Sequence, residues 1–178
     1  MFVVQKQVVV AGGADARCQA LDSCEVFEGQ HKAWRTVGPL NKRRLYPVAA
    51  TWSDKLFVFG GRVEQKALDD TEEYDSKAEK WTILNDRLMK VGRHDMAAAY
   101  LHNSVYLLGG SSSWELKPLQ SAERFVWKSS KFQRVAPLPE KCRASCCVVV
   151  TATDELLQRI CARNCSDFEK KFVKLMNR

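Results

Sequence analysis

The chain has 178 residues, 46% of them hydrophobic and 10% aromatic, which excludes a disordered chain and suffices for the core of one ordinary domain. No apolar run approaches the roughly 20 residues of a membrane-spanning helix, and the N-terminal residues lack the pattern of a signal peptide. The formal charge of +7 is diffuse, because residues 51–100 carry 8 Lys/Arg against 10 Asp/Glu, whereas a nucleic-acid footprint is a concentrated stripe. We therefore expect a cytoplasmic or nuclear protein with reduced cysteines that binds neither nucleic acid nor membrane.

Three predicted strands each end in a pair of glycines, at QVVVAGG, KLFVFGG and SVYLLGG. The pairs begin at Gly12, Gly60 and Gly109, so that they are 48 and then 49 residues apart. Glycine at a strand end indicates a backbone angle φ closed to other residues, or the close approach of a neighbouring backbone. The second glycines of these pairs are Gly13, Gly61 and Gly110.

Other residues follow the same period. After each glycine pair a further strand carries a glutamate and an aromatic residue, at CEVFE, EEYDS and AERFV. A large aromatic residue comes eight or nine residues after the glutamates Glu25, Glu73 and Glu123, and these aromatic residues are Trp34, Trp81 and Phe132. An arginine then precedes a strand of small residues, PVAATW or MAAAYL, and Arg44 and Arg93 each stand 16 residues before the next glycine pair.

Four short strands repeated about every 50 residues are the signature of a β-propeller blade of the kelch type. The joint spacing of these residues makes roughly residues 1–153 resemble kelch repeats, most of all the kelch domain of kelch-like (BTB-kelch) adaptor proteins. We predict an all-β fold, a partial kelch-type β-propeller with about three four-stranded blades and the start of a fourth. The expected bounds are 1–43, 44–92 and 93–142 for the blades and 143–153 for the fourth-blade stub, which Arg143 opens.

Each repeated residue has an expected structural role. Small residues such as Ala49 and Ala98 suit the innermost strand, where blades converge on the axis. The three large aromatic side chains are expected to pack between neighbouring blades, burying on the order of 150–250 Å² each. The resemblance implies that the repeat arginines bond to carbonyl groups of a neighbouring blade.

The repeat stops after Arg143, and a different period replaces it. Leu157, Cys161, Cys165 and Phe168 recur at helical spacing, which predicts an amphipathic helical tail over residues 154–178. Because kelch propellers of the family have more blades than three, the resemblance leaves three alternatives open. The chain is a fragment of a longer adaptor, or two copies self-associate to complete the ring, or the tail caps a partial propeller.

The sequence gives little indication of catalysis or metal binding. Enzymes on kelch and related propellers include a copper oxidase and sugar mutarotases, but His31, His94 and His102 fall at different phases of the repeat. The spacings of the later cysteines lack the paired knuckles of a structural zinc site, so these are expected to be buried thiols, namely Cys142, Cys146, Cys147, Cys161 and Cys165. We expect no catalytic residue, no metal and no cofactor.

Binding is the function that the resemblance implies. In kelch-like adaptors, partner contacts come mainly from the loop after the double glycine and from the one or two positions after the repeat arginine. Carried over by position, the predicted rim residues are Arg62, Ser111, Ser112, Ser113 and Trp114 in the loops, and Leu45, Tyr46, His94, Asp95, Ala144 and Ser145 after the arginines.

Two of these residues bear on specificity. In some relatives, an arginine at the position of Arg62 grips an acidic peptide. Those relatives carry a second arginine after the repeat arginine, but here that residue is Tyr46 or Asp95, which argues against such specificity. Trp114 is the best single anchor if exposed, and the alternative is that it folds back onto its own blade.

The sequence therefore predicts a protein–protein interaction module that binds a protein substrate or peptide through its loops. The role that the resemblance implies is substrate recognition of the cullin-type ubiquitin ligase adaptors, without the BTB and BACK regions through which such adaptors dimerise and hold cullin. The alternatives are actin or cytoskeletal binding and, in another class, a propeller enzyme.

Overall fold

The structure is a computed structural model that describes residues 2–4, 7–112, 115 and 117–144. Its strands form three four-stranded sheets and one two-stranded sheet, and all paired strands are antiparallel. No helix with the length and apolar content of a membrane span occurs in this part of the chain. The predicted tail over residues 154–178 and the predicted inner strand of a fourth blade lie outside the described residues.

Each four-stranded sheet is one blade. Blade one comprises β1 (Phe2–Val4), β2 (Gln7–Ala14), β3 (Ala20–Glu28) and β4 (Ala33–Val37). Blade two comprises β5 (Val48–Trp52), β6 (Lys55–Phe59), β9 (Thr71–Asp75) and β10 (Lys80–Ile83). Blade three comprises β11 (Ala97–Leu101), β12 (Ser104–Leu108), β13 (Ala122–Val126) and β14 (Lys131–Val135), and the small sheet is the hairpin of β7 (Arg62–Val63) and β8 (Lys66–Ala67). The prediction of an all-β fold with three four-stranded blades is confirmed.

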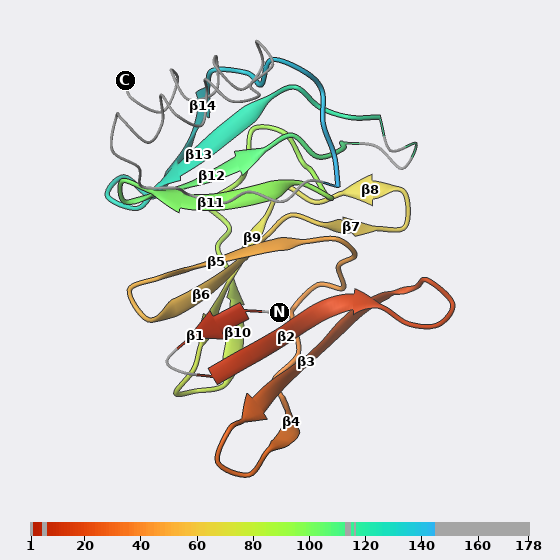
Figure 1. Ribbon diagram of the computed structural model, residues 1–178, viewed down its shortest axis with the longest axis vertical. Coiled ribbons are helices and arrows are strands. Elements are labelled where there is room, and N and C mark those ends of the chain that lie inside the picture. Colours follow the sequence, from red (N-terminus) through yellow and green to blue (C-terminus); the bar gives the residue numbers. More distant parts are fainter. Residues whose placement is uncertain (1, 5–6, 113–114, 116, 145–178) are drawn as a thin grey trace, which may run out of the picture.

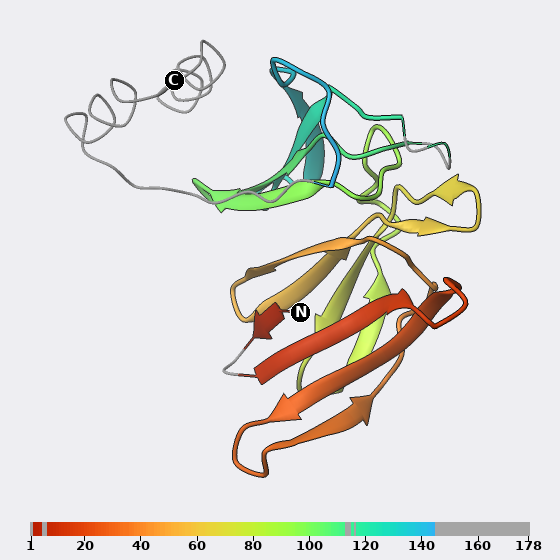
Figure 2. The same cartoon turned by 45° about the vertical axis from the view of Figure 1, so that its right-hand side comes forward.

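The three blades stand side by side and fan out from their first strands (Figures 1 and 2). The first strand of blade two, β5, contacts the first strands β1 and β11 of its neighbours. Ala49 and Ala50 of β5 and the three alanines of β11 therefore lie where the blades converge. The loops that follow the glycine pairs all lie on one side of the stack, at the right in Figure 1, and we call this side the rim.

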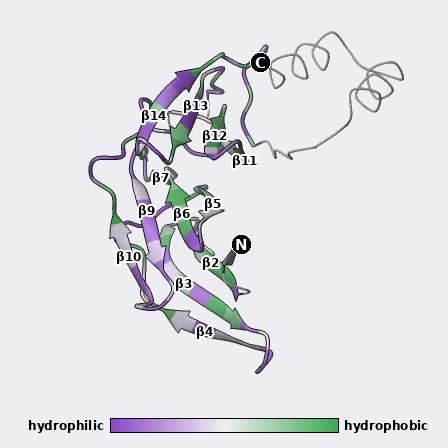
Figure 3. Cartoon of the chain, turned by 90° about the vertical axis from the view of Figure 1, so that its left-hand side faces the viewer, coloured by the Kyte–Doolittle hydropathy of each residue, from purple (hydrophilic) through white to green (hydrophobic). Residues whose placement is uncertain are grey.

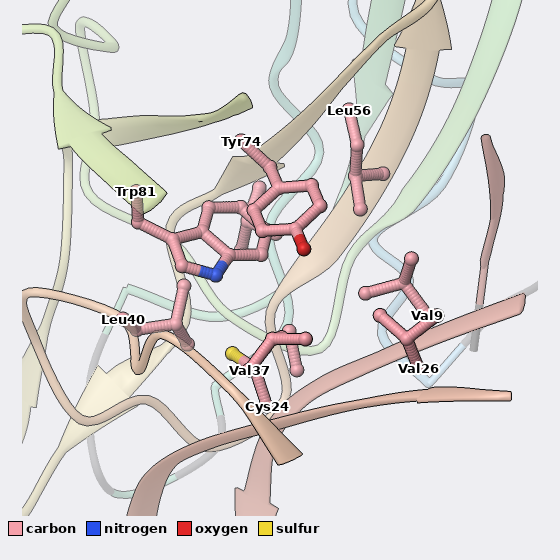
Figure 4. Close-up of a cluster of buried hydrophobic side chains, with 10 residues drawn as sticks. Val9, Cys24, Val26, Val37, Leu40, Leu56, Tyr74 and Trp81 are labelled. Carbon is pink, nitrogen blue, oxygen red and sulfur yellow. The ribbon is translucent and has the colours of Figure 1, made fainter. Parts of the chain in front are cut away.

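A hydrophobic cluster fills the space between blades one and two (Figure 4). Val9 and Val26 of blade one face Leu56 and Tyr74 of blade two, and each of these side chains is at most 1% exposed. Trp81 packs against Tyr74 with ring centroids 4.9 Å apart. At the outer edge of the same interface, ion pairs add to this packing.

That outer edge is held by Arg35 of blade one. Its Nη1 and Nη2 atoms donate to the Glu79 carboxylate of blade two at 2.8 and 2.6 Å, and its Nε donates to Glu28 at 2.6 Å. The guanidinium lowers the pKa of both carboxyl groups below their usual range, because it donates these charged hydrogen bonds to their ionised forms. The pairs are partly exposed to solvent, so each contributes little to stability.

A second cluster, mostly aromatic, fills the space between blades two and three. Phe59 packs edge-on against Phe132 at 6.1 Å, and Trp52 stacks on Trp127 at 4.5 Å. The second strand β6 supplies side chains to both clusters and is largely green in Figure 3, whereas the outer strand β10 is pale. The core therefore lies between the sheets.

Trp34 does not pack between blades, so that part of the prediction is wrong. By register Trp34 pairs with Phe27 in the same way that Trp81 pairs with Tyr74 and Phe132 pairs with Phe125. Trp81 and Phe132 are 6% and 4% exposed, but Trp34 is 49% exposed. The reason is that the corresponding face of blade one has no neighbouring blade among the described residues.

Candidate functional site

The rim is positioned by buried arginines in the connectors between blades. Arg44 is fully buried in the connector from blade one to blade two. Its guanidinium donates to the Gly60 carbonyl at 2.7 Å, to Asp70 at 2.9 Å and to Glu72 at 2.5 Å. These charge-assisted bonds fix the connector to the next blade.

Arg93 does the same between blades two and three. It is fully buried and donates to the Gly109 carbonyl at 2.9 Å, to the Ser121 carbonyl at 2.9 Å and to Glu123 at 2.6 Å. Both arginines therefore bond to carbonyl groups of the sheet that follows them in the chain. With the blade bounds expected from the sequence, 44–92 and 93–142, these carbonyls belong to the arginine's own blade and not to a neighbouring one. They also bond to buried carboxylates, Glu72 and Glu123, which the spacing of the arginines does not indicate.

The buried carboxylate of blade two is Glu72 and not Glu73, the residue singled out from the sequence. Glu72 is 0% exposed, whereas Glu73 is partly exposed and pairs with Lys55 at 2.5 Å. A constant spacing was the available signal, because Glu72 and Glu123 both stand nine residues before their blade's large aromatic residue, Trp81 and Phe132.

The glycine pairs let the connectors approach. All six glycines have positive φ, from +56° at Gly60 to +110° at Gly13. A Cβ on Gly60 would stand 2.3 Å from the Arg93 carbonyl oxygen, and the following residue, Gly61, donates its N–H to that same oxygen at 2.9 Å. The first glycine of a pair is thus required for the contact between a strand end and the next connector.

The same backbone hydrogen bond corrects the position of the third repeat arginine. Gly13, Gly61 and Gly110 donate their N–H groups to the carbonyls of Arg44, Arg93 and Cys142, respectively. Cys142, and not Arg143, therefore stands at the arginine position. Arg143 comes one residue later, and its guanidinium lies 3.4 Å from the Asp95 carboxylate. The rim positions after the repeat residue are consequently Arg143 and Ala144, instead of Ala144 and Ser145.

Hydrogen-bonded residues of left-handed conformation line the inner edge of the rim. Tyr46, Asp95 and Ala144 are each the second residue after a repeat position, and their φ values are 50°, 57° and 52°. The Asp95 N–H donates to the Tyr46 carbonyl at 3.0 Å, and the Ala144 N–H donates to the Asp95 carbonyl at 2.9 Å. The three side chains are therefore presented in equivalent orientations by successive connectors.

Tyr46 and Arg62 form a contacting pair on this rim, with Tyr46 exposed and Arg62 partly exposed. The Tyr46 ring is 50% exposed, and the Arg62 guanidinium lies over it, 5.8 Å from the ring centroid. Leu45 and Arg62 exchange two backbone hydrogen bonds of 2.9 and 2.8 Å, which fix the hairpin of β7 and β8 beside the connector. No carboxylate of the described residues forms an ion pair with Arg62.

Three of the predicted rim residues are buried, so they support the rim and do not offer contact area. Leu45 is 4% exposed, and His94 and Ser111 are 0% exposed. His94 and Ser111 exchange backbone hydrogen bonds of 3.0 and 2.8 Å, equivalent to those of Leu45 and Arg62. Ser112 is exposed, and the predicted contacts Ser113, Trp114 and Ser145 lie outside the described residues.

The described residues bring together no group of three or more side chains that could hold a metal ion. His31 pairs with Glu28 at the outer edge of blade one, His94 is buried under the rim, and His102 lies in the turn between β11 and β12. Cys24 is a buried thiol between blades one and two, and burial raises its pKa to about 11. Cys18, by contrast, is exposed.

Comparison with known proteins agrees with this architecture. The kelch motif matches residues 43–87. Beta-scruin of Limulus polyphemus is 23% identical over 148 residues, which cover 79% of this chain and 16% of beta-scruin. An F-box/kelch-repeat protein of Arabidopsis thaliana is 34% identical over 79 residues, covering 42% of this chain and 19% of that protein. Human kelch-like protein 23 is 26% identical over 102 residues, covering 57% and 18%.

Among solved structures, the chain is similar to that of YjhT, a kelch β-propeller, with a TM-score of 0.67 and 11% identity. The match covers 78% of this chain and 51% of the YjhT chain, and at this identity it shows the fold alone. The chain spans 16–19% of the length of the curated relatives named above. The repeated glycine pairs, the buried connector arginines, the blade topology and these matches together show that the chain contains kelch-type blades and is similar to kelch-repeat proteins.

Proposed function

We propose that this chain is a protein-interaction module and that it binds its protein partner on the rim, with Tyr46 and Arg62 as the central contacts. The observation that carries the proposal is the accessible Tyr46 ring beneath a guanidinium that has no carboxylate partner among the described residues. Tyrosine and arginine are enriched at protein interfaces, and a rigid scaffold that presents loops is a common recognition device.

The charges nearby define the partner's chemistry. Arg62 suits one aspartate, glutamate or C-terminal carboxylate, because its guanidinium can donate two parallel hydrogen bonds. Asp95, on the next connector, is partly exposed and already lies 3.4 Å from Arg143. A strongly acidic peptide would meet this second carboxylate. We therefore propose a partner segment with a single acidic side chain beside an apolar one that covers the Tyr46 ring.

Affinity purification with quantitative mass spectrometry tests the rim. Partners of the full chain should be lost with Tyr46→Ala and with Arg62→Ala. The matched control is Tyr100→Ala, because Tyr100 is a tyrosine of similar exposure, 44%, that lies next to the turn opposite the rim. Partners that survive both rim substitutions, or that are lost equally with Tyr100→Ala, would contradict the assignment.

The finer proposal is substrate recognition of the ubiquitin ligase adaptor type. It rests on the resemblance to kelch-like adaptors, and the relatives include a kelch repeat and BTB domain-containing protein of Caenorhabditis elegans and the F-box/kelch-repeat protein. If this chain binds such a substrate, its overproduction should compete with the adaptor and lengthen the substrate's half-life. Tyr46→Ala should remove that effect, and an unchanged half-life for a partner bound at the rim would contradict the finer proposal.

The cytoskeletal alternative has a separate test. Cosedimentation of the full chain with filamentous actin should leave the chain in the supernatant if the adaptor-type proposal is right. Saturable pelleting that Tyr46→Ala abolishes would instead favour an actin-binding rim.

A further inference from the structure

The outer face of blade one repeats the residues by which the other two blades bind their neighbours. The strand registers and the position of each first glycine show which residues of the two blades are equivalent. Where blade two has Leu56, Val58, Glu72, Tyr74 and Trp81, blade one has Val8, Val10, Glu25, Phe27 and Trp34, respectively. The two sets have the same chemistry: two aliphatic residues, a glutamate and two aromatic residues. We call the second set the outer face of blade one.

In blade two this set is the contact surface for the preceding blade. Leu56 and Val58 are 0% exposed, and Tyr74 is 1% exposed, all in the cluster shared with blade one. The central Glu72 carboxylate accepts hydrogen bonds from the connector, which include the backbone N–H groups of Asn41 and Lys42 at 2.8 and 3.1 Å. The Arg44 guanidinium also donates a hydrogen bond to this carboxylate.

Blade three uses the same device. The Glu123 carboxylate accepts the backbone N–H groups of Lys90 and Val91 at 2.7 and 3.1 Å, together with the Arg93 guanidinium at 2.6 Å. In blades two and three, which both have a preceding blade, the glutamate at this register position therefore accepts hydrogen bonds from two backbone N–H groups and one arginine.

On the outer face of blade one, the equivalent carboxylate and the large aromatic ring are accessible. Glu25 is exposed, and its carboxylate forms no hydrogen bond with any of the described residues. Trp34 is 49% exposed, and its ring packs against that of Phe27 with centroids 5.3 Å apart. The face thus combines apolar area with a carboxylate whose counterparts both bind a guanidinium.

We propose that the outer face of blade one docks a further kelch-type blade, and that it selects a blade whose connector carries an arginine at the position of Arg44. The aromatic and aliphatic side chains supply the buried area, and Glu25 supplies the selectivity. A connector without that arginine would bury the Glu25 carboxylate without a counter-charge, which is costly.

A second copy of this chain does not meet this requirement. Ring completion by self-association would bring the connector after blade three onto Glu25, and the residue at the arginine position of that connector is Cys142. A thiol is a weak hydrogen-bond donor and carries no positive charge. The proposal therefore assigns this face to a blade other than blade three of a second copy.

An in-register duplication tests the proposal on the full chain. Residues 1–48 are added in front of Met1, because Gly12 and Gly60 are 48 residues apart and the added segment then ends where the next inner strand begins. The added segment brings its own Arg44 onto the original Glu25. We expect the duplicated chain to unfold at a higher urea concentration than the natural chain.

The substitution Glu25→Gln in the original segment then gives the decisive comparison. It should lower the urea midpoint of the duplicated chain and leave that of the natural chain unchanged. When Arg44→Gln is first introduced into the added segment, Glu25→Gln should cause no further decrease. Capture of partners at the rim should not change with Glu25→Gln, so this proposal and the rim proposal can fail separately.

Three outcomes would overturn the inference. The first is an equal effect of Glu25→Gln on the two chains, and the second is a duplicated chain that fails to fold or unfolds at a lower urea concentration. The third is a natural chain that sediments as a dimer and dissociates on Glu25→Gln, because a second copy would then dock without the arginine. Sedimentation velocity of the natural chain should instead show no assembly that depends on Glu25.

Discussion

The substitution Arg44→Ala should be among the most destabilising single changes in this chain. Removing one partner of a buried ion pair costs about 3–5 kcal/mol, because the other charge stays buried. Here Asp70 keeps its bond to Lys42 at 2.5 Å, so the uncompensated charge is that of Glu72. Glu72 in turn keeps three donors, the two backbone N–H groups of the connector and the Asn41 side chain at 2.9 Å. We therefore expect a loss near the lower bound, about 3 kcal/mol.

Urea unfolding followed by circular dichroism measures this loss, provided that the slope of the transition is unchanged. Arg44→Ala together with Glu72→Gln should cost less than the sum of the two single losses, since the buried charge is gone. The matched control is Arg17→Ala, because Arg17 is exposed and its loss should stay within about 0.5 kcal/mol. A loss below about 1 kcal/mol for Arg44→Ala would refute the idea that this guanidinium neutralises a buried carboxylate.

Three further substitutions or measurements test other contacts. Gly60→Ala should cost more than about 1 kcal/mol in urea unfolding, because its φ is +56° and a Cβ would meet a carbonyl oxygen at 2.3 Å, whereas Gly29→Ala, with nothing within 4 Å, should be nearly neutral. Iodoacetamide at about pH 8 should modify Cys18 and spare Cys24 until the protein unfolds, as peptide mass spectrometry can show, because the pKa of the Cys24 thiol is about 11. Because Arg35 lowers the pKa of its two glutamate partners, its contribution is present above their ordinary pKa and is lost as the pH falls through the lowered values. The urea midpoints of the natural chain and Arg35→Gln should thus converge on acidification, and a constant difference down to about pH 3 would contradict this.

Much of the fold could be predicted from the sequence, because the repeat is defined by constant spacings between residues that lie close together in the chain. Arg44 and Arg93 stand the same 16 residues before a glycine pair, and in the structure each bonds to the carbonyl of that pair's first glycine. The innermost alanines follow from the same count. Spacing within one repeat is set by strand and turn lengths, which are short-range properties of the chain.

The errors arose where a position depends on a neighbouring blade. Trp34 has the right spacing for an inter-blade residue, but its exposure depends on what lies against blade one. Arg143 is an arginine near the expected place, and no glycine pair follows it in the sequence from which its position could be counted back. The backbone hydrogen bond from Gly110 to Cys142 decides that position, and such a bond is visible only in three dimensions.

The rim itself was predicted only in part. Positions after the repeat arginine could be carried over by resemblance, but the sequence does not tell which of them point outward. The first position pairs with the strand after the glycines and is buried at Leu45 and His94, while the second has positive φ and is exposed at Tyr46. The pairing makes the first position after the repeat arginine buried and the second exposed, and this alternation is the signal that was missed.

The left-handed residues of the rim have a consequence for how such a surface can change over generations. Their backbone is held by main-chain hydrogen bonds from connector to connector, so tyrosine, aspartate and alanine occupy equivalent places without altering the chain path. Mutation at these places can therefore exchange one chemistry for another at little cost to folding. Under the rim proposal, a lineage can thereby acquire new partner preferences while its scaffold is inherited unchanged.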